Sequence, residues 1–175
     1  PRDRCRGPPN RASAEAANLL KLKSFSDVPA SFWAREEIEI LAALGTMPGY
    51  PDDSFKPDDN IKRGELAEIL KTPGPVERPQ APATRLEGAI MTVRFANLSG
   101  GRVIVSPYPD IPGRHWAAEL VTQAKEAGLL KFIGDKFEPK RKLTRAEAAA
   151  MLFQTKFVQD KLKNYELDGG GKNVL

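Results

Sequence analysis

The chain has 175 residues, enough for one compact domain or two small ones, and 41% of them are hydrophobic, which allows a buried core. Its formal net charge is +4, its Lys and Arg residues are scattered, and no basic helix or aromatic-interleaved patch occurs, so nothing indicates nucleic acid as a partner. No apolar run approaches the ~18 residues that a membrane helix needs, so no membrane span is expected.

The N-terminal segment, residues 1–24, is predicted to hold one helix near 12–22, within "RASAEAANLL". The chain begins at Pro1 rather than Met, which predicts a processed protein or a piece of a larger product. Its single cysteine, Cys5, excludes an intrachain disulfide and a cysteine-based metal site. No role for Cys5 follows from the residues around it.

Residues 25–72 form a first repeat that is predicted to fold as helix, loop, helix. Its opening, "FSDVPASFWAREEIEILAALG", places Ala34, Ile38, Leu41 and Leu44 at helical spacing, which predicts a helix over 33–44 with one apolar stripe. Gly45 stands where a left-handed residue would end that helix. A loop then leads to a second helix, expected over 61–71.

The middle of the chain combines a linker with part of a repeat. Residues 73–82, "PGPVERPQAP", are rich in proline and are predicted to be a linker. In residues 83–106, Thr84 and Glu87 form a capping box that predicts a helix over 84–96, and a short strand is expected at 103–105. This piece and the N-terminal one resemble only the second half of a repeat.

Residues 107–158 form a last repeat with the same spacing as the first, except that the loop after the first helix differs by one residue. Six positions separate Asp27 from Trp33 and also Asp110 from Trp116. The pattern predicts helices over 116–127 and 144–158, the first ended by Gly128 and the second begun by the capping box of "TRAE". Residues 159–175, a tail ending in "LDGGGKNVL", are expected to be flexible.

The tryptophans, the histidine and a cluster of aspartates could each serve structure or ligand binding. Trp33 and Trp116 open their helices and are predicted to be buried at equivalent positions. Replacing either with alanine would then lower the free energy of unfolding by ~3–5 kcal/mol. The alternative is that they stack on sugar. His115 is the only histidine, so a structural role is expected. The aspartates of residues 52–59 miss the calcium-loop pattern and suit turns and caps. No metal site is expected.

These residues resemble the S-layer homology motif of bacterial cell-surface proteins. The resemblance implies a mostly α fold in which helix-loop-helix repeats form a pseudo-threefold bundle. It also implies an extracellular domain at the cell envelope, which anchors a surface protein or S-layer by binding a pyruvylated secondary polysaccharide linked to peptidoglycan. The first repeat matches the motif at Phe25, Asp27, Val28, Trp33, Ala34, Gly49, Tyr50, Asp52, Phe55, Pro57, Arg63 and Glu65. The last repeat matches at Asp110, His115, Trp116, Ala117, Phe137, Pro139, Thr144, Arg145, Ala146 and Glu147.

The same resemblance implies that the arginine of each "TRAE" segment contacts the glycan. A guanidinium donates two parallel hydrogen bonds to a carboxylate, and a helix N-terminus beside it adds positive potential. Arg145 is expected to contribute more than Arg63, because Gly64 loosens the first turn after Arg63. The alternative is that both are first-turn residues without a ligand. The predicted glycan-contacting residues are Arg145, Arg63, Glu147, Glu65, Trp116, Trp33, Gly49 and Tyr50.

No enzyme class is supported by the sequence. It shows no nucleophile–base pair, phosphate loop or metal cluster, and no pair of carboxylates is singled out for glycoside hydrolysis. No cofactor is expected. The alternative function is a structural subunit of an envelope assembly, in which the repeats bind other copies or other envelope proteins.

Overall fold

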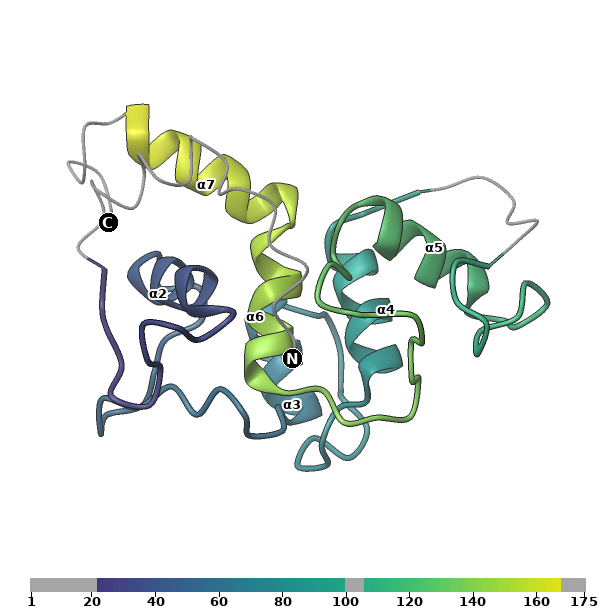
Figure 1. Cartoon of the computed structure of the whole chain (residues 1–175), viewed down its shortest axis with the longest axis horizontal. Helices are drawn as coiled ribbons and strands as arrows, with labels where there is room; N and C mark the ends of the chain where they lie inside the picture. Colours follow the sequence, from purple (N-terminus) through teal and green to yellow (C-terminus); the bar gives the residue numbers. More distant parts are fainter. Residues whose placement is uncertain (1–21, 100–105, 168–175) are drawn as a thin grey trace.

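The computed structural model describes residues 22–99 and 106–167. Within these ranges the chain is mostly helical, as predicted, and contains no sheet (Figure 1). The expected helix near 12–22 and strand at 103–105 lie outside the described residues. The helices are α2 (Arg35–Ala43), α3 (Arg63–Ile69), α4 (Arg85–Phe95), α5 (Ala118–Glu126), α6 (Arg145–Phe153) and α7 (Lys156–Leu167).

The helix boundaries follow the predicted caps. Gly45 and Gly128 have φ values of 63° and 75°, and each ends a helix in the left-handed conformation that glycine adopts without steric cost. Thr84 and Thr144 begin α4 and α6 with complete capping boxes. Lys62, which precedes α3, makes no side-chain cap, so that helix begins without this local support.

The helix expected over 144–158 is instead two helices. α6 ends at Phe153, and α7 begins at Lys156 and continues to Leu167, into the segment expected to be a tail. Side chains bind the carbonyl groups freed at the break: the Thr155 hydroxyl donates to Leu152 O at 2.6 Å and the Gln159 amide to Phe153 O at 2.7 Å. The change of direction lets α7 bury Val158 and Leu162.

Three short segments meet in a closed ring of backbone hydrogen bonds, which marks the pseudo-threefold axis. Ile61 N donates to Leu143 O at 3.0 Å, Leu143 N to Ala83 O at 2.9 Å, and Ala83 N to Ile61 O at 2.9 Å. All three side chains are fully buried. Each segment precedes one of the helices α3, α4 and α6, so residues 73–99 supply the third member of the ring, which we call the middle repeat.

The first helix of each full repeat packs onto the second helix of a neighbouring repeat. α2 packs on α6 and α5 packs on α4, on opposite sides of the molecule (Figure 1). α4 also packs on α6, so the half-repeat of residues 83–106 joins the bundle formed by the two full repeats. The middle repeat has no first helix, so no described helix packs along α3 in the way that α2 and α5 cover α6 and α4.

The shortness of the middle repeat also explains why one tryptophan is exposed. Trp33 is half-buried, with its ring centroid 5.9 Å from that of Phe132 in the loop of the last repeat. Trp116 is 70% exposed, so the prediction of two equivalent buried tryptophans is wrong. The loop that would cover Trp116 belongs to the middle repeat, which is too short to supply it. Replacing Trp116 is therefore expected to remove little core packing.

Candidate functional site

The arginine at the start of each second helix pairs with a glutamate of the next repeat around the axis. Each of these glutamates stands two residues after its own helix-opening arginine, and in the described structure the pairs form a closed cycle. The pairs are Arg63 with Glu87 at 3.4 Å, Arg85 with Glu147 at 2.9 Å, and Arg145 with Glu65. The Arg-x-Glu segment that opens each second helix therefore joins neighbouring repeats, and in α4 and α6 its glutamate also caps its own helix.

The capping box fixes the glutamates for this second contact. In α6, Glu147 Oε2 accepts the backbone N–H of Thr144 at 3.2 Å, and Oε1 accepts Arg85 Nη2 at 2.9 Å. In α4, Glu87 Oε2 accepts the N–H of Thr84 at 2.8 Å, and Oε1 faces Arg63. One carboxylate thus serves a helix start and a neighbouring repeat at once.

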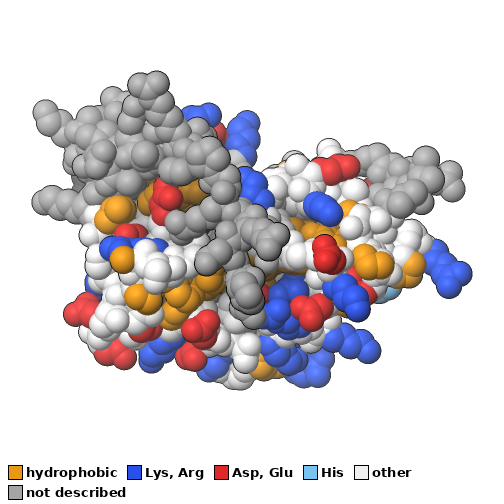
Figure 2. All heavy atoms as spheres, in the orientation of Figure 1, with side chains coloured by type: hydrophobic (Ala, Val, Ile, Leu, Met, Phe, Trp, Pro, Cys, Tyr) orange, Lys and Arg blue, Asp and Glu red, His pale blue; other side chains and the backbone are white. Residues whose placement is uncertain are grey.

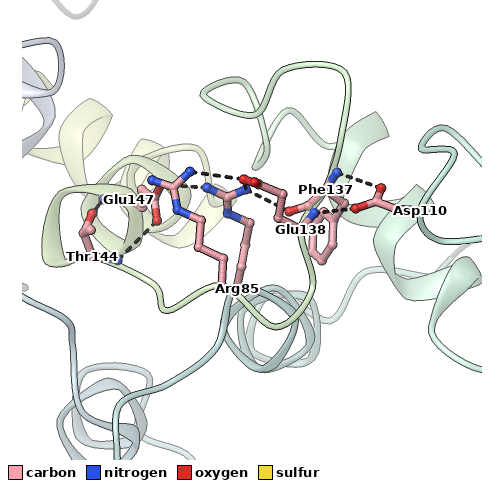
Figure 3. Close-up of polar contacts among 7 residues, drawn as sticks. Arg85, Asp110, Phe137, Glu138, Thr144 and Glu147 are labelled. Atoms are coloured by element: carbon pink, nitrogen blue, oxygen red, sulfur yellow. Dashed lines mark hydrogen bonds and ion pairs between the residues drawn. The ribbon is translucent and has the colours of Figure 1, made fainter.

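The guanidinium of Arg85 contacts both Glu138 and Glu147 (Figure 3). The residue is 3% exposed, and its Nη1 donates to Phe137 O at 2.8 Å and to Glu138 Oε2 at 3.1 Å. Its Cζ lies 5.9 Å from the centroid of Phe132, on which Trp33 packs. Among the described residues its Nε has no hydrogen-bond partner. An outside ligand has no direct access to this guanidinium.

Arg145 is equally buried, at 3% exposure. Its Nε donates to Phe55 O at 2.8 Å and its Nη2 to Pro48 O at 3.4 Å, while Nη1 pairs with Glu65. Its Cζ lies 4.8 Å from the ring centroid of Tyr50. Burial lowers the pKa of Arg145 below its ordinary value. All three nitrogens thus have partners within the protein.

A groove of about 410 Å³ lies beside Arg145, between α3, α7 and the loop after α2. Glu65, Lys71 and Lys161 line it together with Arg145. Glu65 and Tyr50 both contact Arg145, and Gly49 precedes Tyr50 in the chain, so four of the eight residues predicted to contact the glycan lie close together. Gly49 serves packing here, because a Cβ atom would lie 2.1 Å from Phe25 Cε1 and 2.8 Å from the Ser54 carbonyl oxygen.

Arg63 differs from the other two arginines. Its side chain is 20% exposed, and its one charged contact among the described residues is the 3.4 Å pair with Glu87. No described carbonyl accepts a side-chain hydrogen bond from Arg63, because the middle repeat lacks the long loop that Phe55 and Phe137 anchor in the other repeats. The Nε and Nη2 groups of Arg63 thus have no hydrogen-bond partner within the described ranges.

Rotation about the axis assigns Trp116 to the site of Arg63. Trp33 packs on the loop that faces Arg85, and the rotation that carries Arg85 to Arg63 carries Trp33 to Trp116. The predicted site residues are therefore divided among three places. Glu147 and Trp33 lie at the Arg85 site, and Glu65 and Tyr50 lie at the Arg145 site with Gly49 next to Tyr50 in the chain. Trp116 corresponds to the Arg63 site by the pseudo-threefold rotation alone.

Two aspartates hold the loops that contact the buried arginines. Asp27 accepts the backbone N–H groups of Phe55 at 2.9 Å and Lys56 at 2.7 Å, and Asp110 accepts those of Phe137 and Glu138 at the same distances. Both aspartates match the motif in sequence, but their hydrogen bonds to these loops were not predicted. The signal was present in their nearly equal separation from the Phe-x-Pro segment, 28 residues in the first repeat and 27 in the last.

The carboxylate of Asp110 should make the fold sensitive to acid. Burial alone would raise its pKa, but the hydrogen bonds from Phe137 and Glu138 outweigh that effect and hold the pKa below the ordinary 3.8. A depressed pKa stabilises the fold above the unfolded-state value, and this contribution is lost as the pH falls through the folded-state value. The relevant window therefore lies below about pH 4.

We expect Asp110→Asn to lower the free energy of unfolding at pH 7 by ~1–2 kcal/mol, because the amide accepts only one of the two N–H groups. The variant should also lose less stability than the wild type between about pH 4 and pH 2. Urea denaturation followed by circular dichroism at several pH values measures both effects. Asp135→Asn, at an exposed aspartate of the loop that Asp110 holds, is the matched control. Parallel pH profiles for Asp110→Asn and the wild type would contradict the assignment.

We also searched the described residues for a charged surface patch, a metal site and a membrane-spanning helix. Acidic and basic side chains interleave on the face seen in Figure 2, without a large area of one sign. No group of three potential metal ligands occurs among the described residues. No described helix has the length and apolar composition to cross a membrane. The arginine sites are therefore the candidate functional feature.

The chain is similar to S-layer homology domains and to cell-surface proteins. The model of the S-layer homology domain matches residues 24–67 and 107–149, together about half of the chain. Cell surface glycoprotein 1 of Acetivibrio thermocellus is 28% identical over 79% of the chain, an S-layer protein of Bacillus licheniformis is 27% identical over 76%, and the cellulosome-anchoring protein of Acetivibrio thermocellus is 28% identical over 74%. The matched region spans 5%, 20% and 25% of the length of these relatives, respectively.

Proposed function

Because the chain belongs to the S-layer homology domain family, we propose that it anchors a surface protein to the bacterial cell envelope by binding a pyruvylated secondary polysaccharide linked to peptidoglycan. Its place of action would be the outside of the cell, at the cell surface, in keeping with the names of its relatives. The role is one of binding, with no reaction catalysed.

The observation that carries this proposal is the open site of Arg63. Its guanidinium has unpartnered donors on the edge formed by Nε and Nη2, which suits the two oxygens of a pyruvyl carboxylate. Arg63 is the first residue of α3, and the backbone N–H groups of Arg63 and Gly64 there already donate to Ala81 O and Pro79 O, each at 2.9 Å, so the guanidinium itself is the group that would bind an anion. Exposed Trp116, at the same site by symmetry, offers a flat apolar surface to a sugar ring.

The other predicted contacts would act by shaping the sites. They would hold neighbouring repeats together. One group is Arg145 with Glu65, Gly49 and Tyr50, and the other is Glu147 with Trp33. A ligand carboxylate at Arg145 would have to displace Glu65 and two carbonyl groups. We therefore place the direct contact at Arg63, which reverses the order expected from the sequence.

Binding to purified cell-wall sacculi tests the proposal. The chain should co-sediment with sacculi that retain the secondary polysaccharide and should stay in solution with sacculi from which that polymer has been extracted. Recovery with both preparations, or with neither, would contradict the proposal. An unrelated basic protein of similar net charge is the control for adsorption to anionic wall material.

The second candidate function, a structural subunit with protein contacts, is favoured by one observation. Trp116 is 70% exposed at a position where the equivalent Trp33 packs on a neighbouring repeat. Tryptophan is enriched among residues that dominate protein interfaces.

A further inference from the structure

Each site around the axis has places for an arginine, a loop aromatic and a tryptophan from three different repeats. The Arg85 site fills all three: the Phe132 centroid lies 5.9 Å from Arg85 Cζ and 5.9 Å from the ring centroid of Trp33. Because the middle repeat lacks its first half, the Arg145 site lacks a tryptophan and the Arg63 site lacks a loop aromatic. Among the described residues, Tyr50 has no tryptophan on its ring, and Trp116 has no loop aromatic beneath it.

We propose that two copies of the chain complete each other, with Trp116 of one copy packing on Tyr50 of the next. The template is the contact between Trp33 and Phe132 within one chain. Tyr50 corresponds to Phe132, since each stands five residues before the phenylalanine of its Phe-x-Pro segment. The inference does not rest on polysaccharide binding, and it concerns the chain without its wall ligand.

The residues around Tyr50 are already held in a geometry that could accept an aromatic partner. Arg145 Cζ lies 4.8 Å from its ring centroid and is held by Phe55 O and Glu65, so this side of the site is fixed before association. Lys56 Nζ lies 4.4 Å from the same centroid, on a side chain that is 40% exposed and able to move aside. The cations also suit the electron-rich face of an indole ring.

Trp116 has the properties of the inserting residue. It is one of two large hydrophobic side chains that are exposed in the described structure, the other being Phe157. His115 stacks beside it, with 5.7 Å between ring centroids, and the His115 Nδ1 accepts the backbone N–H of Ala117 at 3.2 Å. These contacts hold the start of α5 in place. Association would remove the exposed indole from water.

The two surfaces differ, so the contact is heterologous. A copy that uses its Trp116 still offers a free Tyr50, and its partner still offers a free Trp116. Association therefore continues head to tail instead of stopping at a symmetric dimer. A contact centred on one aromatic pair is small, so we expect weak and concentration-dependent growth.

Sedimentation equilibrium of the chain without polysaccharide tests this inference. The weight-average mass should rise above the monomer mass of 19.2 kDa, and past twice that value, as the concentration is raised to about 1 mM, where even a weak contact is populated. Trp116→Ala and Tyr50→Ala should each abolish this rise. Lys136→Ala, at an exposed residue of the last repeat, is the control that should keep it.

Mixing the two variants gives the sharper result. Trp116→Ala keeps Tyr50, and Tyr50→Ala keeps Trp116, so an equimolar mixture should form a complex that stops at twice the monomer mass. Circular-dichroism melting checks that each variant is folded, and Tyr50→Leu, which keeps apolar bulk without the flat ring, replaces Tyr50→Ala if the latter melts below the working temperature. A wild type that stays monomeric, or a mixture that stays monomeric, overturns the inference. Failure of sacculus binding would leave these results unaffected.

Discussion

Replacing Arg85 with alanine is expected to lower the free energy of unfolding by ~3–5 kcal/mol, the usual cost of removing one partner from a buried ion pair. The loss leaves the Glu147 carboxylate, whose side chain is 8% exposed, without its closest cation. It also leaves Phe137 O without the Nη1 donor. Because domains of this size are stable by only ~5–15 kcal/mol, the variant should unfold at a clearly lower urea concentration.

The matched control is Arg141→Ala. Arg141 Nη2 also approaches Glu147, at 3.5 Å, but its side chain is 40% exposed, so its loss should cost less than ~1 kcal/mol. The double variant Arg85→Ala with Glu147→Ala should lose less stability than the sum of the single variants, because the two residues act as a pair. A cost below ~1 kcal/mol for Arg85→Ala would show that the cycle of pairs does not hold the repeats together.

Replacing Arg63 with alanine is expected to weaken binding of pyruvylated polysaccharide by about ten- to a hundred-fold, with a small change in stability. A charge-assisted hydrogen bond contributes ~1.5–3 kcal/mol, and ~1.4 kcal/mol corresponds to one decade in affinity. Arg63→Lys should recover the charge without the paired donors and so rescue binding only in part. Lys62→Ala, at the exposed neighbouring residue, is the matched control.

Stability measured alongside affinity separates the two kinds of arginine. Arg145→Ala should destabilise the fold, because it leaves Glu65 and the carbonyl of Phe55 without their donor. Arg63→Ala should leave the unfolding midpoint nearly unchanged, since the residue makes one 3.4 Å pair and is partly exposed. Unchanged polysaccharide affinity in a folded Arg63→Ala variant would contradict the placement of the ligand at Arg63.

Local patterns in the sequence predicted the parts of the fold that depend on local interactions. The capping box of Thr144 and Glu147 and the left-handed glycines at 45 and 128 mark helix ends through contacts with their own helix. The repeat spacing predicted which helices are equivalent, and the family resemblance supplied the threefold arrangement. The break at Gln154 was missed because the apolar pattern continues through it, and only the packing of α7 decides where the chain turns.

The candidate site depends on contacts between residues far apart in the chain, which local patterns do not reveal. Arg85 and Glu147 are 62 residues apart, and Arg145 and Phe55 are 90 apart. The sequence favoured Arg145 because its capping box is intact, whereas access to each arginine depends on the loop of another repeat. Trp116 is exposed for the same reason: the segment that would cover it is absent from the middle repeat.

Titration calorimetry of the wild-type chain against purified wall polysaccharide, before and after removal of its pyruvyl groups, tests the proposed function most directly. Binding should be measurable with the pyruvylated polymer, should weaken as salt is added, and should fall by at least about tenfold when the carboxylate-bearing groups are removed. Equal affinity for the two forms, or no heat of binding with either, would contradict anchoring through a pyruvylated polysaccharide.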